Sequence, residues 1–213
     1  MTNANWRLFL VSAFASCAGL ALAQPLPDAD LVNALRGGGH VIVVRHGATH
    51  ADQADTDPLN VDQPGNEAKQ RHLNDKGRAT ARAWKEAFQK MGIPVGKVYS
   101  SKFARAQETA RLAFGEPSAT FDVTEGGQVV SPNENNRRTA ALRKMAATAP
   151  DPGTNTIIVS HKPNVIDAFG KDWFDVREGE ASVFRPDGQG GYKVVGRVTA
   201  EQWATLAEKY PKY

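Results

Sequence analysis

The chain has 213 residues, of which 41% are hydrophobic and 23% are charged. This composition is typical of a globular protein and excludes a disordered or fibrous one, and the length favours one compact domain with a sizeable core. The formal net charge is only +3 and there is no dense Lys/Arg tract, so the sequence does not indicate a nucleic-acid-binding protein.

Residues 1–23 have the three-part pattern of a secretory signal peptide. Arg7 precedes an apolar run, and Ala-Leu-Ala ends at Ala23. We expect cleavage after Ala23 and export to the bacterial periplasm or secretion, which leaves residues 24–213 as a single mature domain without stable membrane insertion. The alternatives are a membrane anchor, for which the apolar run is short, and a lipoprotein modified at Cys17.

Cys17 is the only cysteine of the chain. A mature chain that begins at residue 24 therefore has no disulfide, no cysteine nucleophile and no thiolate metal site. Such a chain is compatible with an oxidising compartment. Removal of residues 1–23 takes away Arg7 and no acidic residue, so the mature side chains carry a net charge of 3 − 1 = +2.

The mature chain is expected to begin with a short helix that starts at Pro27 or Asp28 and ends at Gly37. A strand follows over residues 40–45, and its near-continuous run of β-branched residues is typical of a parallel sheet covered by helices. Residues 48–72 are polar and predict a long loop. Loops of this length are often functional lids.

Residues 73–92 predict a helix capped by Asn74 or Asp75, with a buried face of Ala79, Ala83, Trp84, Ala87, Phe88 and Met91. The elements expected after it are, in order, a strand over 97–101, a helix over about 102–114, a strand over 119–123, a polar loop over 124–136, a helix over 136–149, a strand over 156–160, a helix over 163–169, a β-hairpin over 181–198 and a helix over 199–209. This alternation predicts an α/β fold with a mainly parallel sheet and an antiparallel C-terminal hairpin.

Unusual polar residues stand at three of the expected strand ends. One strand runs into Arg45 and His46, the next ends at Ser100-Ser101 with Arg105 one turn into the following helix, and a later strand ends at Ser160-His161. Ligands of open α/β sheets bind beyond the carboxyl ends of the strands. If these strands are neighbours, two histidines and two arginines converge at one edge of the sheet.

These residue types suit phosphoryl transfer. The planar guanidinium of arginine binds phosphate oxygens in pairs, and a neutral imidazole can attack phosphorus and carry the phosphoryl group. A second imidazole can stabilise the charge of the transition state. Gly47, directly after the first histidine, would let the backbone approach a ligand closely.

Four blocks of the sequence resemble the histidine phosphatase superfamily, also called the phosphoglycerate mutase-like superfamily. They are VVRHGAT at 43–49, LNDKGRATA at 73–81, SSKFARAQETA at 100–110 and VSHKPNV at 159–165, in the order of the family. The segment EGEASVFRPDGQGG near the C-terminus is similar to small exported bacterial members. The resemblance implies a three-layer α/β sandwich that uses no metal and no other cofactor.

By this resemblance, His46 is the nucleophile that becomes phosphorylated, and three further residues hold the phosphoryl group: Arg45, Arg105 and His161. Gly47, Thr49 and His50 follow the nucleophile and are also candidate substrate-binding residues. His50 has a second interpretation, as a metal ligand together with Asp52, Asp55 or Asp57. Ligands on a polar loop are poorly held, so we expect no metal site.

The proton donor for the leaving group is expected among four glutamates. One branch of the superfamily places an acid directly after the second histidine, but this chain has Lys162 there. The other branch takes a glutamate from the loop after the arginine-bearing helix, which makes Glu134 the first candidate and Glu125 the second. Glu178 and Glu180 form a further acidic pair downstream.

The expected function is metal-independent hydrolysis of a small phosphomonoester through a phosphohistidine intermediate on His46. Two alternatives remain open: a phosphomutase, and a catalytically silent protein that binds phosphate or phosphosugar ligands. The sequence has no nucleotide-binding glycine pattern, and it does not indicate the natural substrate or the oligomeric state.

Overall fold

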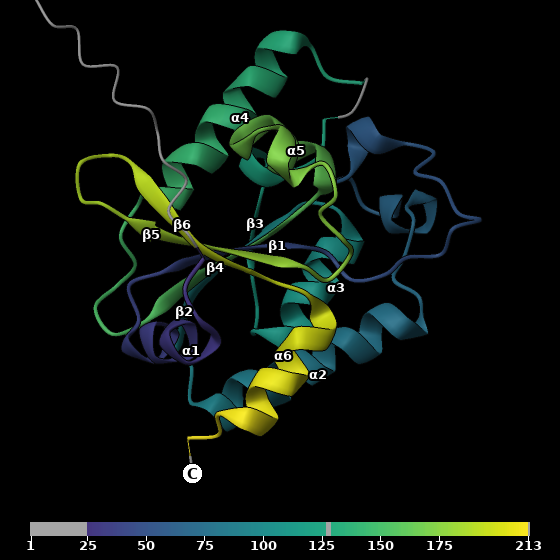
Figure 1. The fold of residues 1–213 in the computed structure, drawn as a ribbon. Helices are drawn as coiled ribbons and strands as arrows, with labels where there is room; N and C mark the ends of the chain where they lie inside the picture. The colour runs from purple at the N-terminus through teal and green to yellow at the C-terminus, as the bar shows by residue number, and fades with distance from the viewer. Residues whose placement is uncertain (1–24, 127–128, 213) are drawn as a thin grey trace, which may run out of the picture.

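A mixed sheet of six strands lies at the centre of the molecule (Figure 1) in the computed structural model, which describes residues 25–126 and 129–212. The strand order is β3-β2-β4-β1-β5-β6. The strands are β1 (Val41–Arg45), β2 (Val95–Ser101), β3 (Ser118–Thr120), β4 (Asn155–Ser160), β5 (Ala181–Pro186) and β6 (Tyr192–Val198). Strands β1 to β4 are parallel, whereas β5 pairs antiparallel with β1 and with β6. The expected signal peptide, residues 1–23, lies outside the described residues.

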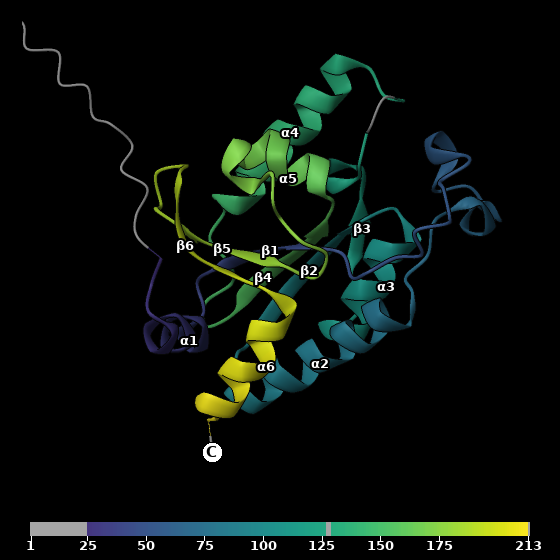
Figure 2. The ribbon, with the colours of Figure 1, turned by 45° about the vertical axis from the view of Figure 1, so that its right-hand side comes forward.

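Helices cover both faces of the sheet (Figure 2). On one face lie α1 (Asp28–Gly37), α2 (Asp75–Met91), α3 (Ala104–Ala113) and α6 (Ala200–Lys209), and on the other lie α4 (Pro132–Ala146) and α5 (Lys162–Phe169). Four 3₁₀ turns complete the described elements: η1 (Pro58–Asn60), η2 (Asn66–Lys69), η3 (Phe121–Val123) and η4 (Lys171–Trp173). The three-layer sandwich with an antiparallel C-terminal hairpin is therefore confirmed.

The β-branched run of β1 explains its central place in the sheet. Ile42 and Val44 pack into the core cluster that includes α1, α2, α3 and α6, whereas Val41 and Val43 pack into the cluster that includes α4 and α5. Strand residues alternate between the two faces, so a strand covered by helices on both sides must be apolar at successive positions.

The structure differs from the sequence-based expectations at two elements. The helix expected over 136–149 begins at Pro132, because Ser131 Oγ accepts a hydrogen bond from Glu134 N and proline suits the first helical position. The strand expected over 119–123 covers only Ser118–Thr120, and η3 follows it.

The buried face of α2 is also shifted from the expected one. Trp84, Phe88 and Met91 are buried as expected, but Gly77 and Ala81 complete that face. Ala79 and Ala83, which were expected on it, are exposed.

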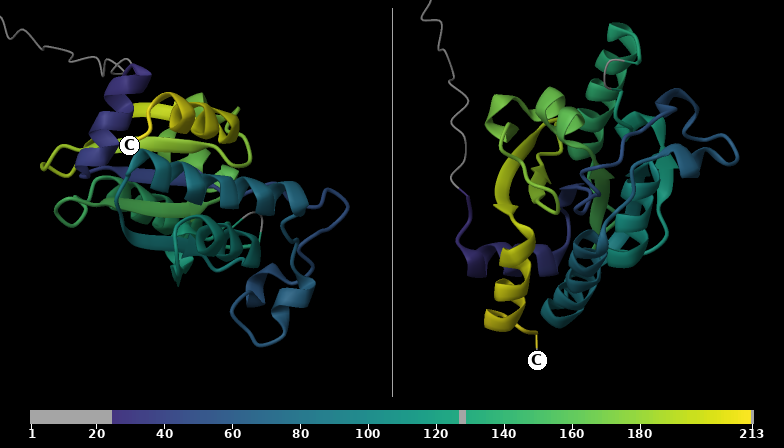
Figure 3. Two further views of the ribbon diagram at one scale, coloured as in Figure 1. Left: turned by 90° about the horizontal axis from the view of Figure 1, so that it is seen from below. Right: turned by 90° about the vertical axis from the view of Figure 1, so that its right-hand side faces the viewer.

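The long loop over residues 48–72 contains only the turns η1 and η2, as expected from its polar sequence. It extends beyond the first turn of α2 (Figure 3), and its two ends are joined by an isolated bridge between Thr49 and Leu73. Near its end, Gln70 Oε1 accepts a hydrogen bond of 2.7 Å from Ala104 N at the start of α3. The loop is thus attached beside the carboxyl ends of the parallel strands.

Residues 25–126 and 129–212 contain the six α-helices α1 to α6. None of them is both long enough and apolar enough to cross a bilayer.

Candidate active site

The expected convergence of histidines at the sheet edge is confirmed. Strands β1 and β4 are neighbours in parallel register, with Arg45 opposite Ser160. His46 and His161 therefore follow at the same level, and their rings lie edge to face with centres 5.1 Å apart. Both side chains are buried, with 2% of His46 and 0% of His161 exposed.

The geometry of His46 fixes which ring nitrogen can react. His46 Nδ1 lies 2.8 Å from the carbonyl oxygen of Gly47. A carbonyl only accepts hydrogen bonds, so Nδ1 carries the proton and Nε2 keeps its lone pair. Burial and the positive charge of Arg105 hold the pKa of His46 well below its usual value of 6.5. His46 is therefore a neutral imidazole with Nε2 available as a nucleophile.

His161 has a complementary proton arrangement. Its Nε2 lies 2.7 Å from Ser101 Oγ, which already accepts a hydrogen bond from Phe103 N. The Ser101 hydroxyl proton is free to be donated to Nε2, which leaves the ring proton of His161 on Nδ1. That nitrogen faces Glu125 Oε2 at 3.4 Å. Burial and the charge of Arg105 hold the pKa of His161 well below 6.5, so this ring is also neutral.

Arg105 is brought to the two histidines by the first turn of α3 and is completely buried. Its Nη1 donates to Asp55 Oδ1 at 2.9 Å, and its Nη2 donates to Glu125 Oε2 at 3.3 Å. The guanidinium also packs 4.2 Å from the centre of the Phe103 ring. Its orientation is therefore determined by packing and by two carboxylates.

Arg45 is the second expected arginine of the site. Its Nη1 donates to Val176 O at 2.9 Å, and its Nη2 lies 3.6 Å from Glu178 Oε1. Thr49 donates its hydroxyl to the same Glu178 oxygen at 3.1 Å. Thr49 therefore orients the carboxylate that pairs with Arg45, and its expected contact with substrate stays a prediction.

Arg71 is a residue of the site that sequence reasoning missed. It lies at the end of the 48–72 loop, and its positive charge contributes to lowering the pKa of both His46 and His161. Its backbone N donates to Asp55 Oδ1 at 2.9 Å. The one available signal was its position two residues before the LNDKGRATA block, because the loop itself has no periodic pattern.

Several donors of this site are buried without a partner. Among the described residues, the Nε atoms of Arg45, Arg71 and Arg105 and Nδ1 of His161 complete no hydrogen bond. Buried polar groups of folded proteins are nearly always hydrogen-bonded. These four donors, all from residues near His46, are available to an anion with several oxygens.

The four candidate glutamates occupy different places. Glu125 contacts both Arg105 and His161. Glu134 lies in the first turn of α4, not in a loop, and hydrogen bonds from Arg137 and Arg138 lower its pKa to about 2. Such a carboxylate holds no proton at neutral pH, so the structure does not support Glu134 as the proton donor.

The other two glutamates pair with arginines as well. Glu178 contacts Thr49 and Arg45. Glu180 accepts a hydrogen bond of 2.6 Å from Arg197.

Gly47 makes a close backbone contact with α2, and its expected approach to a ligand stays a prediction. Its N–H donates to Thr109 Oγ1 at 3.0 Å and is therefore not directed at a ligand. A Cβ atom at Gly47 would lie 2.9 Å from the carbonyl oxygen of Gly77 in α2. The glycine is needed for the close contact between the strand end and this helix.

His50 and Lys162 lie at the margins of the site. His50 is half-buried, and its backbone N donates to His72 O at 3.2 Å. Lys162 Nζ lies 4.7 Å from the centre of the Phe174 ring, so its charge is directed to an exposed aromatic side chain rather than to His46.

Two of the acidic residues near His50, Asp55 and Asp57, pair with basic side chains. Asp55 binds Arg105, and Asp57 binds Lys69 Nζ at 2.9 Å. Within residues 25–126 and 129–212, no three His, Cys, Asp or Glu side chains form an arrangement suited to a metal ion.

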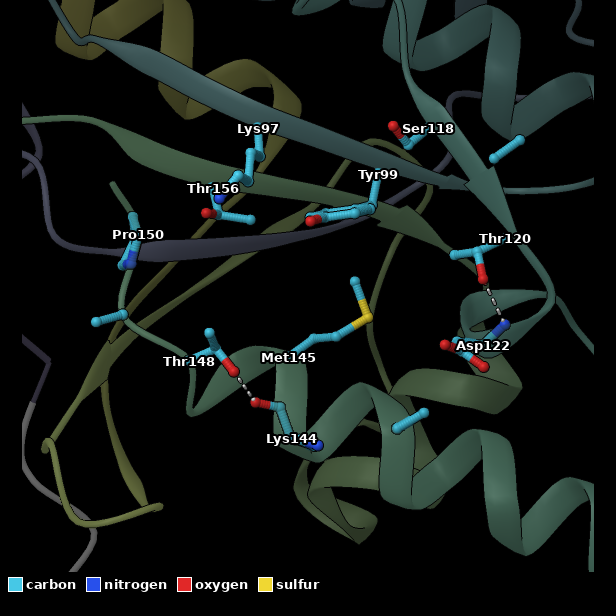
Figure 4. Close-up of a pocket in the computed structure, with 13 residues that line it drawn as sticks. Lys97, Tyr99, Ser118, Thr120, Asp122, Lys144, Met145, Thr148, Pro150 and Thr156 are labelled. Carbon is cyan, nitrogen blue, oxygen red and sulfur yellow. Dashed lines mark hydrogen bonds between the residues drawn. The ribbon is translucent and has the colours of Figure 1, made fainter. Parts of the chain in front are cut away.

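A cavity of about 420 Å³ lies elsewhere, between β2, β3 and the C-terminal half of α4. Tyr99 and Met145 point into it from the sheet and from the helix (Figure 4). Its lining contains neither the two histidines nor the three arginines described above. The groups suited to phosphoryl chemistry are therefore not in this cavity.

Comparison with known proteins gives a family match that covers several residues of this site. Residues 41–127, which include Arg45, His46 and Arg105, match the family model described as the histidine phosphatase superfamily (branch 1). The mitochondrial serine/threonine-protein phosphatase Pgam5 of Drosophila mojavensis is 33% identical over 99 residues, which are 46% of this chain and 29% of the fly protein. The chain thus aligns with less than a third of that relative.

Solved structures share the fold at low sequence identity. The protein histidine phosphatase SixA complexed with tungstate has a TM-score of 0.50 at 18% identity, over 76% of this chain and 97% of that chain. A putative alpha-ribazole-5'-P phosphatase from Escherichia coli has a TM-score of 0.51 at 16% identity, over 74% and 95% of the two chains. At these identities the likeness shows the fold alone.

Proposed function

We propose that this chain, of which residues 41–127 match the histidine phosphatase superfamily model, is a phosphatase that hydrolyses a small phosphomonoester through a phosphohistidine intermediate on His46. The observation that carries the proposal is the set of four buried, unsatisfied donors around a neutral imidazole whose Nε2 is free. A phosphoryl group satisfies these donors with its oxygens and places phosphorus within reach of Nε2.

The reaction follows in two steps. His46 Nε2 attacks phosphorus, the bond from phosphorus to the ester oxygen breaks, and the leaving oxygen takes a proton from an acid of the site. Water then attacks the phosphoryl group, the bond from phosphorus to Nε2 breaks, and the same acid, now a carboxylate, recovers a proton from that water. Free phosphate and the starting imidazole result.

The phosphoryl oxygens are held by the arginines and by His161. Arg45, Arg71 and Arg105 supply three positive charges, and the developing charge in the transition state is greatest on these oxygens. His161 Nδ1 adds a neutral N–H donor. Because the guanidinium of Arg105 is fixed by packing on Phe103, it does not need to reorganise during the reaction.

Glu125 is the proposed proton donor in place of Glu134. Its Oε2 lies between Arg105 Nη2 and His161 Nδ1, at 3.3 Å and 3.4 Å. A phosphoryl group held by these two donors lies beside this carboxyl group, where an acid can protonate the leaving oxygen. Neither Glu178 nor Glu180 contacts both of these groups in the described interactions.

Hydrolysis of an aryl phosphate in the presence of a chelator tests the nucleophile, because an aryl leaving group needs little proton assistance. We expect turnover by the wild type, none by His46→Ala, and unchanged turnover by His72→Ala, a histidine of the same loop region outside the site. Mass spectrometry of quenched enzyme should find the phosphoryl group on the peptide with His46.

Loss of turnover on chelation, or turnover that survives in His46→Ala, contradicts the mechanism. Phosphate binding without any turnover by folded wild type favours the catalytically silent alternative. Transfer of the phosphoryl group to a second hydroxyl of the substrate favours the mutase.

We also propose that the protein is exported after cleavage at Ala23, on the basis of the apolar run after Arg7. Expressed in a bacterium with two membranes, the chain should appear in the osmotic-shock fraction with Gln24 as its first residue by mass spectrometry. The variant Leu10→Arg interrupts the apolar run and should keep the full chain in the cytoplasm. A wild-type chain that starts at its first residues and stays in the cytoplasm contradicts export.

A further inference from the structure

The phosphate-binding guanidinium of Arg105 is occupied by two carboxylates in this structure. Asp55 Oδ1 lies 2.9 Å from Nη1, and Glu125 Oε2 lies 3.3 Å from Nη2. Together they occupy both terminal nitrogens and leave only Nε without a partner, so a phosphate that binds this guanidinium with two oxygens must displace a carboxylate. Arg105 has no exposed surface, so an incoming phosphate cannot reach these nitrogens while both carboxylates remain.

Asp55 comes from the 48–72 loop, which lies beside α3 (Figure 2). Its Oδ1 also accepts the backbone N–H of Arg71 at 2.9 Å. The side chain is 20% exposed, whereas that of Arg105 is fully buried. Asp55 thus closes the site from the solvent side, between two of the three arginines.

Carboxylates oppose the arginine charges of the closed site. Asp55 and Glu125 pair with Arg105, and Glu178 lies 3.6 Å from Arg45, whereas Arg71 contacts Asp55 through its backbone N–H. Both histidines are neutral, because burial holds their pKa values well below 6.5. The carboxylates therefore oppose part of the positive charge that a phosphate group with two negative charges would meet at the arginines.

Of these three carboxylates, Asp55 is the one on the long loop. Its displacement needs a change within residues 48–72 but not in the sheet or in α3. The ends of the loop have separate attachments, at the Thr49 and Leu73 bridge and at the hydrogen bond from Ala104 to Gln70. Asp55 can therefore leave Arg105 while both ends of the loop stay attached.

We propose that Asp55 is a displaceable anion that competes with phosphate for Arg105. In the free protein its carboxylate takes the place of a phosphoryl oxygen on Nη1. A phosphate group displaces it, and its return promotes release of the product. Because this competition weakens the binding of free phosphate, a substrate must gain affinity through its leaving group, which makes Asp55 a specificity-determining residue.

Binding of inorganic phosphate to Asp55→Asn tests the competition directly. The amide oxygen of asparagine can still accept from Arg71 N and from Arg105, so the variant removes the charge and keeps the shape. We expect the dissociation constant of phosphate, measured by calorimetry, to fall roughly tenfold. Asp55→Ser is a second variant with the same expected direction.

The matched control is Asp57→Asn. Asp57 lies in the same loop and is partly exposed, and its ion pair is with Lys69 rather than with Arg105. We expect its phosphate affinity to equal that of the wild type. Equal or weaker binding by the two Asp55 variants, or equal tightening in Asp57→Asn, overturns the proposal.

The role of Asp55 in product release rests on the proposed phosphatase activity. A second measurement distinguishes failure of the phosphatase proposal from failure of the competition at Arg105. In aryl phosphate hydrolysis, the inhibition constant of phosphate should fall in Asp55→Asn by the same factor as its dissociation constant. If the wild type shows no turnover while Asp55→Asn still binds phosphate more tightly, the phosphatase proposal fails and the competition stands. Normal turnover with an unchanged inhibition constant in Asp55→Asn refutes the competition between Asp55 and phosphate and leaves the phosphatase proposal intact.

Discussion

The imidazole rings of His46 and His161 lie edge to face, 5.1 Å apart, at the ends of two neighbouring parallel strands. Both rings carry their proton on Nδ1, but they present different nitrogens to the site. His46 has its proton on Nδ1, because that nitrogen faces a carbonyl, and presents a bare Nε2. His161 accepts at Nε2 from Ser101 and presents a protonated Nδ1. One ring is therefore arranged to attack and the other to donate.

Ser101→Ala tests this arrangement. The substitution removes the hydroxyl that fixes the proton of His161, so we expect kcat for an aryl phosphate to fall roughly tenfold or more, with little change in KM. The free energy of unfolding should fall by about 1–3 kcal/mol, because His161 Nε2 loses its partner.

Ser100→Ala is the matched control for Ser101→Ala. Ser100 is equally buried, but its Oγ donates to Ser101 O rather than to a catalytic group. A similar decrease of kcat in both variants would mean that general loosening of β2, and not the proton position of His161, causes the effect.

Glu125→Gln and Glu134→Gln together identify the proton donor. For an alkyl phosphate, we expect kcat to fall about 10²- to 10⁴-fold in Glu125→Gln, because an alkoxide needs a proton as it leaves. The loss for an aryl phosphate should be much smaller. Glu134→Gln should retain wild-type rates, since its carboxylate binds Arg137 and Arg138. A large loss of kcat in Glu134→Gln, with wild-type rates in Glu125→Gln, would instead identify Glu134 as the donor.

The residues that sequence reasoning located correctly are those that follow recognisable strands. His46 and His161 come directly after β-branched runs, and the carboxyl ends of adjacent parallel strands meet at one edge. Arg105 was located by its place one turn into the next helix. These positions depend on local patterns that the sequence displays.

The residues that were missed depend on tertiary contacts. Arg71 and Asp55 lie in a loop without periodicity, and only the folded loop brings them to Arg105. The start of α4 is different, because Ser131 and Pro132, with Glu134 at the third helical position, form a capping pattern that the sequence shows. Glu134 could therefore have been placed in a helix from the sequence alone.

Stability should decrease as the solution becomes acidic, in part because of the two histidines. Burial holds the pKa values of His46 and His161 well below 6.5 in the folded protein. Below about pH 6.5 the unfolded chain binds protons that the folded one does not, so unfolding becomes more favourable. Each histidine contributes up to about 1.4 kcal/mol per pH unit until the folded pKa is reached.

Denaturant unfolding of the wild type and of His46→Asn between pH 7 and pH 5 measures this contribution. The variant should lose less stability than the wild type over the same range, and His72→Ala should behave like the wild type. Equal pH dependence of the wild type and of His46→Asn would show that His46 does not remain neutral in the folded state.

Arg71→Gln should weaken phosphate binding and change the pH profile. The guanidinium lowers the pKa of both histidines, so its removal raises those pKa values toward 6.5. The acid limb of kcat/KM should therefore move to higher pH, because protonated His46 cannot attack. Arg111→Gln, an exposed arginine of α3 paired with Glu116, is the control. An unchanged acid limb in Arg71→Gln would exclude Arg71 from the electrostatics of the site.

Gly77→Ala tests the contact between α2 and the strand end that carries the nucleophile. A Cβ atom there would overlap the backbone of Ala48, so the helix or the strand end must move. We expect the free energy of unfolding to fall by about 1–3 kcal/mol, as for other overpacked sites, and kcat to fall because Gly47 and His46 shift with the chain.

Gly37→Ala in α1 is the control for that contact, because a Cβ atom there meets nothing within 4 Å. It should leave kcat unchanged and stabilise the protein by up to about 1 kcal/mol through helix propensity. If Gly77→Ala is as stable and as active as Gly37→Ala, the close approach of α2 does not position His46.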